Sequence, residues 1–240
     1  MYESLAAYYD KFMMDVPYAE WVSYVESFLG GSAKLGRDVG CGTGKFTVAL
    51  KRDGYDVTGS DSSPEMLRAA EEYARTSGVN VRFLLQSAEK LEDHAELDFV
   101  IACCDVVNYL KNPTPFFQSA YRILKKGGVL AFDISSEYKL KEIIGNNLFT
   151  DESDDGIIYL WENSLRRGAV DMKLTFFAPN ANNLYLKHVE TQTQYIHDVL
   201  GIKQKLKEAG FSSVSDYGFL TKTRPKAKEE RIQFIAYKQE

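Results

Sequence analysis

The chain contains 240 residues, of which 45% are hydrophobic and 26% are charged, and its net charge is −5. This composition is typical of one globular domain, with or without an insertion, and excludes disordered and fibrous proteins, while the acidic balance argues against a broad nucleic-acid surface. Three cysteines without a C-x-x-C pair argue against a disulfide framework or a bound metal, and the absence of a secretory signal or a bilayer-length apolar run leads us to expect a cytoplasmic protein without a membrane partner.

The first half of the chain alternates short apolar runs with amphipathic stretches. Apolar residues at helical spacing over 18–29 predict an N-terminal helix that ends at Gly30. The following apolar runs predict strands at about 35–40, 55–60, 80–85, 97–103 and 128–134, and residues 113–124 predict one of the helices between them. This alternation predicts an α/β fold, a doubly wound and mostly parallel sheet with helices on both faces.

The periodicity changes from helical to a period of two after residue 155. Three extended runs, at 157–162, 170–176 and 184–195, predict an antiparallel sheet. A helix at 198–209 and strands near 212–219 and 230–237 follow. We therefore expect one domain formed by residues 1–145 and 197–240, with 1–30 as a helical cap, and an antiparallel β lid inserted at 146–196.

A glycine-rich loop, Asp38-Val39-Gly40-Cys41-Gly42-Thr43-Gly44, separates the first predicted strand from the next helix. Glycines allow the backbone to turn sharply and to approach a ligand closely. A P-loop is excluded because Val39 and Phe46 occupy the positions of its first glycine and its hydroxyl residue. A dinucleotide fingerprint is excluded because Lys45 or Thr47 occupies the position of its last glycine. The pattern D-x-G-x-G-x-G remains.

This pattern resembles motif I of the class I, seven-β-strand S-adenosylmethionine-dependent methyltransferases, and the resemblance extends over most of the chain. Asp61 lies 61 − 44 = 17 residues after Gly44, at the end of the second predicted strand, where family members hold the ribose hydroxyls. Ser62 and Met66 match the segment that packs against adenine in that family. The resemblance implies a Rossmann-like methyltransferase fold with seven strands, S-adenosyl-L-methionine as cofactor and a methyl transfer that requires no metal.

The same resemblance assigns cofactor-binding residues along the whole N-terminal half. They are Tyr9, Trp21, Asp38, Gly40, Cys41, Gly42, Gly44, Asp61, Ser62, Met66, Ser87, Ala88 and Cys103. Tyr9 and Trp21 match an N-terminal segment that covers the methionine half of the cofactor in a small-molecule branch of the family; core packing is the alternative for both. Ser87 stands where many relatives carry an acidic residue that faces adenine, so we expect only a weak contact from it.

Three residues are candidates for a base that removes a proton from the acceptor. Asp105 and Tyr109 follow the fourth predicted strand, in a segment that resembles the family's border of the methyl group, and His188 lies in the third lid run. We predict methyl transfer to a small-molecule acceptor. The alternatives are a tRNA, rRNA or protein methyltransferase, or a non-catalytic protein that binds S-adenosylmethionine. The sequence neither identifies the acceptor nor distinguishes a monomer from a homodimer.

The predicted lid follows the fifth strand of the sheet, near the edge where open α/β sheets bind their ligands. We therefore expect the N-terminal segment and the lid to cover the acceptor pocket together. Six aromatic residues of the predicted lid are candidates for this cover: Tyr159, Trp161, Phe176, Phe177, Tyr185 and Tyr195.

Overall fold

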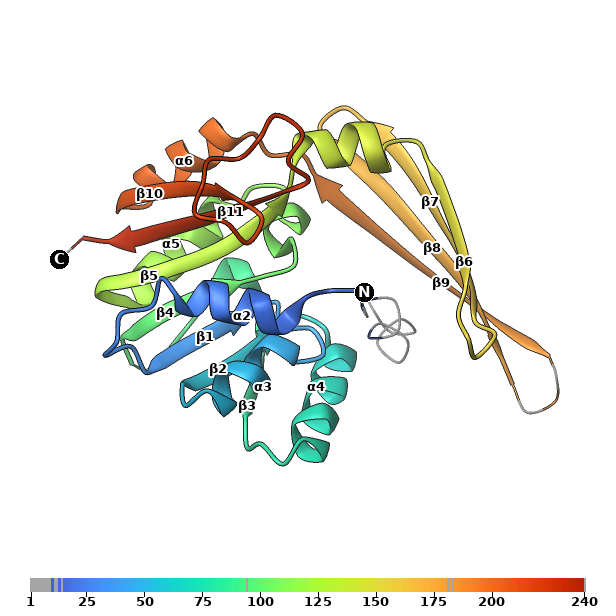
Figure 1. The fold of residues 1–240 in the computed structure, drawn as a ribbon, viewed down its shortest axis with the longest axis horizontal. Coiled ribbons are helices and arrows are strands. Elements are labelled where there is room, and N and C mark those ends of the chain that lie inside the picture. Colours follow the sequence, from blue (N-terminus) through green and yellow to red (C-terminus); the bar gives the residue numbers. More distant parts are fainter. Residues whose placement is uncertain are drawn as a thin grey trace.

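The computed structural model describes residues 10, 13, 15–93, 95–180, 182 and 184–239. This part of the chain forms a seven-stranded sheet covered by helices, from which a four-stranded sheet projects (Figure 1). No helix among the described residues is both long enough and apolar enough to cross a bilayer.

The seven-stranded sheet has the strand order β10-β11-β5-β4-β1-β2-β3. Its strands are β1 (Leu35–Val39), β2 (Asp56–Asp61), β3 (Arg82–Leu85), β4 (Leu97–Ala102), β5 (Leu124–Ser135), β10 (Phe211–Gly218) and β11 (Arg231–Lys238). Strands β1 to β5 pair in parallel, and only β11 runs antiparallel to both of its neighbours, β5 and β10. The mostly parallel sheet predicted from the sequence is therefore confirmed.

Helices cover both faces of this sheet because its central strands are apolar on both sides. On β4, Phe99 and Ile101 pack against α2 (Tyr18–Glu26) and α3 (Lys45–Arg52). The alternate residues of β4, Val100 and Ala102, belong to the cluster that contains α5 (Thr114–Ile123) and α6 (Val199–Glu208). Helix α4 (Pro64–Thr76) packs against β2 and β3. This arrangement is the doubly wound fold expected from the alternating pattern.

The second sheet is antiparallel throughout and is called the lid below. Its strands, in spatial order, are β6 (Leu148–Glu152), β7 (Ile158–Arg166), β8 (Ala169–Pro179) and β9 (Tyr185–Tyr195). The sequence predicted three strands, so β6 is a correction. This edge strand is short and largely exposed, and it therefore lacks the apolar alternation that marked the other three.

A π-helix, η3 (Lys139–Ile144), connects β5 to the lid and was not predicted from the sequence. Its Leu140 and Ile144 pack with Val170 and Met172 of β8 in one buried cluster. Because these contacts join the connection to the lid, the lid is packed onto the core at its base rather than attached by a free linker.

A first prediction concerns the centre of the seven-stranded sheet. A Cβ atom on Gly36 of β1 would lie 2.1 Å from the ring of Phe99, which is fully buried on β4. Gly36→Ala should therefore lower the free energy of unfolding by about 1–3 kcal/mol, the usual cost of overpacking a core. Urea unfolding measures the loss. Gly31→Ala is the control, because no atom lies within 4 Å of its added Cβ, and equal stability of the two variants would contradict the prediction.

Candidate active site

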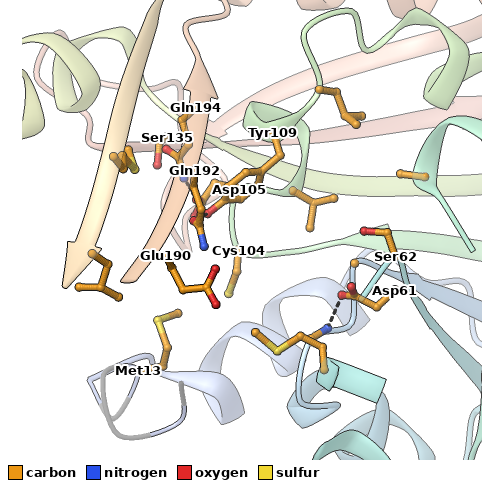
Figure 2. Close-up of a pocket in the computed structure, with 18 of the residues that line it drawn as sticks. Met13, Asp61, Ser62, Cys104, Asp105, Tyr109, Ser135, Glu190, Gln192 and Gln194 are labelled. Atoms are coloured by element: carbon orange, nitrogen blue, oxygen red, sulfur yellow. Dashed lines mark hydrogen bonds between the residues drawn. The ribbon is translucent and has the colours of Figure 1, made fainter. Parts of the chain in front are cut away.

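A cavity of about 410 Å³ lies between the carboxyl ends of the parallel strands and the inner face of the lid (Figure 2). The core contributes the glycine loop and the segments that follow β2, β3 and β4; the lid contributes Tyr159, Trp161, Met172, Leu174, Glu190, Gln192 and Gln194. A second, small cavity of about 30 Å³ shares Gly40, Gly42 and Cys104 with the first. The two cavities are therefore adjacent and meet at the glycine loop.

The glycine loop is shaped for close approach of a ligand. Gly42 has φ +52° and lines both cavities, and a Cβ atom there would meet no other atom within 4 Å. Gly40 has φ +66°, and a Cβ atom there would lie 2.6 Å from the side chain of Val106. Both conformations are costly for residues with a side chain. A ligand can therefore approach the backbone of Gly42 closely.

Asp61 is the last residue of β2, lies beside this loop and is only 9% exposed. The Gly42 N–H donates to its Oδ2 over 3.0 Å, and the Ser63 N–H donates to its Oδ1 over 2.9 Å. Burial raises the pKa of the Asp61 carboxyl, while these backbone hydrogen bonds oppose the shift. A carboxylate offers about four acceptor positions, so Asp61 retains capacity for hydroxyl groups of a ligand.

Four further predicted cofactor residues line the large cavity on the same side as Asp61. Ser62 lies just before α4 and Met66 lies in its first turn, whereas Ser87 and Ala88 come from the start of a short 3₁₀ helix, η1 (Ala88–Lys90). Ser87 caps η1, because its Oγ accepts a hydrogen bond from the Glu89 N–H over 3.3 Å. The chain thus brings the predicted ribose and adenine residues to one wall of the cavity.

The predicted residues Asp38, Cys41 and Cys103 line the small cavity instead. Burial raises the pKa of the Cys103 thiol well above its ordinary value, which keeps it protonated and argues against a nucleophilic role. Gly44 caps α3 with φ +80° and lines neither cavity. Tyr9 lies outside the described residues.

Trp21 is packed in the core and is only 2% exposed. Its ring meets Phe46 and Phe219 edge-on, and the guanidinium of Arg231 lies 5.1 Å from its centroid. It does not line either cavity. Asp10 instead reaches the glycine loop, where Thr43 Oγ1 donates to its carboxylate over 2.6 Å and Lys45 lies 2.9 Å away. Both of these partners line the small cavity.

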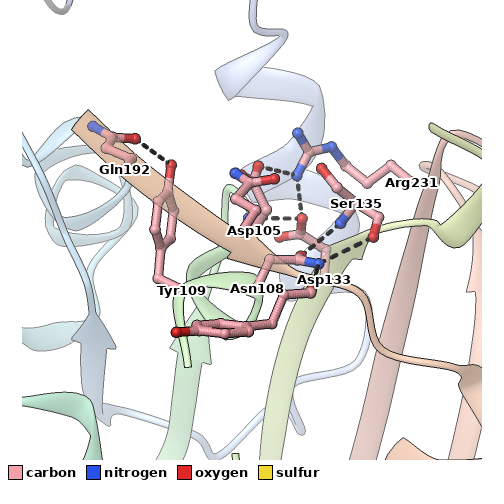
Figure 3. A network of polar contacts seen from close by, with 9 residues as sticks. Asp105, Asn108, Tyr109, Asp133, Ser135, Gln192 and Arg231 are labelled. Atoms are coloured by element: carbon pink, nitrogen blue, oxygen red, sulfur yellow. Dashed lines mark hydrogen bonds and ion pairs between the residues drawn. The ribbon is translucent and has the colours of Figure 1, made fainter. Parts of the chain in front are cut away.

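The segment after β4 takes part in an ion-pair network in which Asp133 is buried and Asp105 and Arg231 are partly exposed (Figure 3). Arg231 pairs with Asp105 at 2.9 Å and also contacts Asp133, whose Oδ2 accepts the Asp105 N–H over 2.9 Å. Asp105 has φ +53°, so its backbone occupies the left-handed region. Burial opposes the charge of Arg231, but Asp133 and Asp105 more than compensate, so the pKa of Arg231 is raised.

The same segment anchors the lid through the 3₁₀ helix η2 (Val106–Tyr109). Gln194 of β9 donates to Asp105 Oδ2. The Tyr109 hydroxyl donates to Gln192 of β9 over 3.0 Å (Figure 3). The Asn108 amide donates to the carbonyl of Tyr195, at the end of β9, over 3.0 Å. These three contacts hold the C-terminal end of β9 against the segment that follows β4, which lines the cavity.

The candidate bases differ in their positions. Asp105 Oδ1 forms an ion pair with Arg231, and its Oδ2 accepts a hydrogen bond from Gln194, so this carboxylate is better placed to hold the lid than to remove a proton. Tyr109 lines the cavity, whereas His188 stacks on Phe176 with ring centroids 4.9 Å apart and is not part of its wall. The proposed roles of these residues stay predictions.

The acceptor side of the cavity contains residues that sequence reasoning missed. They are Lys139, Arg231, Met172, Leu174, Glu190, Gln192 and Gln194. The last three alternate along β9, so a period of two could have marked them. Tyr185 and Tyr195, which the sequence analysis proposed as part of the cover, alternate with these three residues and do not line the cavity. Of the aromatic residues predicted to cover the pocket, only Tyr159 and Trp161 line it.

The chain thus has a Rossmann-like fold with a second, antiparallel sheet that lines one side of the cavity. A family model described as a methyltransferase domain matches residues 37–132. A chain from Geobacillus sp. (strain WCH70) that is named as a methyltransferase is 36% identical, over 99% of both chains. An S-adenosylmethionine-dependent methyltransferase from Clostridium acetobutylicum ATCC 824 superposes with a TM-score of 0.88 at 28% identity, over 100% of this chain and 99% of that one.

The sugar N-methyltransferase KedS8 from Streptoalloteichus sp. ATCC 53650 superposes with a TM-score of 0.80, over 97% of this chain and 93% of that one. At 18% identity this likeness shows the fold alone. Taken together, the comparisons show that the chain belongs to the class I S-adenosylmethionine-dependent methyltransferases and is an enzyme of that family.

A second prediction concerns the proposed ribose contact of Asp61. Asp61→Asn should weaken binding of S-adenosylmethionine by about 1.5–3 kcal/mol, the usual range for hydrogen bonds to a charged acceptor. Calorimetry measures the change. Asp56→Asn makes the same substitution at the opposite, exposed end of β2 and should leave affinity unchanged. Equal affinity of the two variants would remove Asp61 from the binding site.

A third prediction concerns Asp38, which is fully buried. Burial raises the pKa of its carboxyl from 3.8 to about 7, although Thr47 Oγ1, 2.5 Å from Oδ2, stabilises the ionised form. Between about pH 4 and pH 7, the Asp38 carboxyl is therefore protonated in the folded chain and ionised in the unfolded chain. The free energy of unfolding that this group contributes falls as pH rises through this range.

Asp38→Asn removes this titration. Between pH 5 and pH 8, the variant should gain about 1–3 kcal/mol of stability relative to the unsubstituted protein, because only the latter must ionise a buried carboxyl. Urea unfolding of the cofactor-free proteins at both pH values measures the difference. Asp53→Asn, at an exposed site after α3, serves as the control, and a parallel response of all three proteins would refute the assignment.

Proposed function

We propose that the chain transfers a methyl group from S-adenosyl-L-methionine to a small-molecule acceptor held between the core and the lid. The observation that carries this proposal is the cavity of about 410 Å³, which is closed on one side by the glycine loop and Asp61 and on the other by the lid. Its volume falls within the range of small-ligand pockets.

The residues of the core wall have the chemistry that the cofactor requires. The Asp61 carboxylate is suited to ribose hydroxyls, the side chain of Met66 to the flat face of adenine, and the backbone of Gly42 to close packing. Asp38 and Thr43 surround the smaller cavity, which is suited to the amino-acid end. When bound, S-adenosylmethionine supplies a methyl group that is already activated by a sulfonium charge.

This chain's own residues then have two tasks: they align the acceptor and exclude water. The contacts of Asp105, Asn108 and Tyr109 with β9 support alignment of the acceptor, because they fix the position of the lid relative to the core. The apolar side chains of Trp161, Met172 and Leu174 support the second, because they form the lid wall of the cavity. No metal-binding group of three or more His, Cys, Asp or Glu occurs among the described residues.

The test is to incubate the purified protein with methyl-tritiated S-adenosylmethionine and separate metabolite, RNA and protein pools from cells. We expect label in the metabolite pool alone, because the volume of the cavity is that of a small-ligand pocket. Label in RNA or protein would assign the alternative acceptor, and binding of the cofactor without labelling of any pool would favour a non-catalytic role.

A fourth prediction separates cofactor binding from acceptor binding. Trp161→Ala should lower methyl transfer to metabolites at least tenfold, because it removes part of the lid wall, while calorimetry shows unchanged affinity for S-adenosylmethionine. Leu160→Ala changes the adjacent residue, which faces the opposite side of the lid, and should retain activity. Normal turnover by Trp161→Ala would show that the lid takes no part in the reaction.

A further inference from the structure

Two basic residues, Lys139 and Arg231, form part of the wall of the large cavity. Arg231 begins β11 and pairs in register with Ser135, the last residue of β5. Lys139 follows Ser135 by 139 − 135 = 4 residues and begins the π-helix η3. Turns of π-helix occur frequently at functional sites. Two positive charges therefore border the cavity at the carboxyl end of β5.

The side chain of Lys139 has no partner in contact with it. Its backbone N–H donates to Ser136 Oγ, but its ammonium group forms no hydrogen bond or ion pair within the described part of the chain. Burial and the charge of Arg231 lower the pKa of this lysine, and the charges of Asp105, Glu230 and Asp133 offset this only in part. An anion in contact with the ammonium group would favour its charged form.

Arg231 has donors that its ion pairs do not use. It meets Asp105 Oδ1 and Asp133 Oδ2 through the same atom, Nη1. A guanidinium carries further N–H groups on Nη2 and Nε, and neither of these atoms of Arg231 forms a hydrogen bond with a described residue. The carboxylates that hold Arg231 in place therefore leave it able to meet another anion.

A buried acceptor atom on β9 also lacks a partner. Gln194 is 5% exposed, lines the cavity, and uses its Nε2 to donate to Asp105. Its Oε1 is buried and accepts no hydrogen bond from the described residues. Figure 2 shows Gln194 and Asp105 on the side of the cavity away from Asp61 and Ser62. An unpaired buried acceptor is costly, so this atom calls for an N–H or O–H group from a ligand on the acceptor side.

We propose that the acceptor is a small carboxylic acid that also carries an N–H or O–H group. This inference rests on the function proposed above and adds the class of acceptor. The carboxylate of the acid accepts hydrogen bonds from the Lys139 ammonium group, in the field of Arg231, and its N–H or O–H group donates to Gln194 Oε1. Hydrogen bonds between charged groups are roughly twice as strong as neutral ones. Lys139 is therefore a specificity-determining residue of the acceptor side.

Lys139 takes no part in the bond changes of the transfer. A nucleophilic atom of the acid, other than its bound carboxylate, contributes the lone pair that forms the new bond to the methyl carbon. The C–S bond breaks, its electron pair passes to sulfur, and the proton that the nucleophile loses passes to water. Because the carboxylate keeps its charge throughout, its contact with Lys139 contributes equally to the bound state and to the transition state, and its loss should raise KM more than it lowers kcat.

The experiment uses the full chain, methyl-tritiated S-adenosylmethionine and the small-metabolite pool of cells. The pool is first divided by anion exchange in strongly alkaline buffer, where amino groups are uncharged and every carboxylate is retained, and both fractions are returned to neutral pH. We expect label only in products of the retained fraction. Label in products of the unretained fraction would overturn the acid inference while leaving small-molecule methyl transfer intact. A metabolite pool without label in either fraction would contradict both.

A phosphate group would meet the same two cations, so the retained fraction is also treated with alkaline phosphatase before the reaction. We expect the label to persist, because a carboxylate survives this treatment. Loss of the label would assign the bound anion as a phosphate ester and would overturn the assignment to a carboxylate.

Lys139→Met keeps the length of the side chain and removes its charge. We expect kcat/KM for the labelled acid to fall by about 10- to 100-fold, the loss typical of a hydrogen bond to a charged group, with most of the change in KM. Lys139→Arg keeps the charge and should retain more activity than Lys139→Met. Lys141→Met is the matched control, because Lys141 lies on the same π-helix, exposed and paired with Glu137. Its kcat/KM should not change.

Binding of the cofactor shows which carboxylate Lys139 holds, because S-adenosylmethionine has a carboxylate of its own. Lys139→Met should bind S-adenosylmethionine and its demethylated product with the affinities of the unsubstituted protein. Weaker binding of both would mean that Lys139 holds the amino-acid end of the cofactor, and it would overturn the assignment to the acceptor. So would an unchanged KM for the acid in this variant.

Discussion

The arrangement of the site depends on the pairing of Arg231 with Asp105 and with the buried Asp133. Arg231 begins β11, Asp133 lies near the end of β5, and Asp105 follows β4, so one guanidinium joins three segments of the sheet. Gln194 adds the lid to the same group through its bond to Asp105. Loss of one partner from such a buried pair leaves an uncompensated charge, which costs several kcal/mol. The network therefore sets the distance between the lid and the core.

This constraint divides the cavity into two chemically different halves. The core wall consists of backbone at the glycine loop and of side chains at strand ends, which a parallel sheet brings to one edge. The lid wall consists of a continuous face of β7, β8 and β9, in which apolar side chains on two strands adjoin polar ones on the third. The glycine loop of the core wall lies within residues 37–132, which the methyltransferase-domain model matches, whereas the lid lies outside that range.

Packing explains why the aromatic residues of the lid are distributed as they are. Phe176 is fully buried in a cluster with Ile157 and Ala178 within the lid itself. Tyr185 lies on the outer face of β9 and is half-exposed. Part of the apolar surface of this four-stranded sheet is thus buried in its own cluster, where it stabilises the sheet itself. Only Tyr159 and Trp161 remain for the cavity wall.

The sequence by itself determined the doubly wound sheet, the glycine loop and the position of Asp61 at the end of β2. These features depend on local patterns: strand–helix alternation, glycines at fixed spacing, and an acidic residue a set distance further on. The edge strand β6 and the π-helix η3 escaped prediction because their stability comes from pairing with β7 and from packing against β8, not from their own residue patterns.

Only the tertiary structure decided which residues form the acceptor side of the cavity. Arg231 lies 126 residues after Asp105 (231 − 105), and Glu190 lies 129 residues after Asp61 (190 − 61), yet each pair borders one cavity. The period of two in β9 separates its residues into two faces but does not say which face turns inward. The face that turns inward is fixed by the contacts of Asp105, Asn108 and Tyr109 with the C-terminal end of β9. These contacts join segments that no local sequence pattern connects.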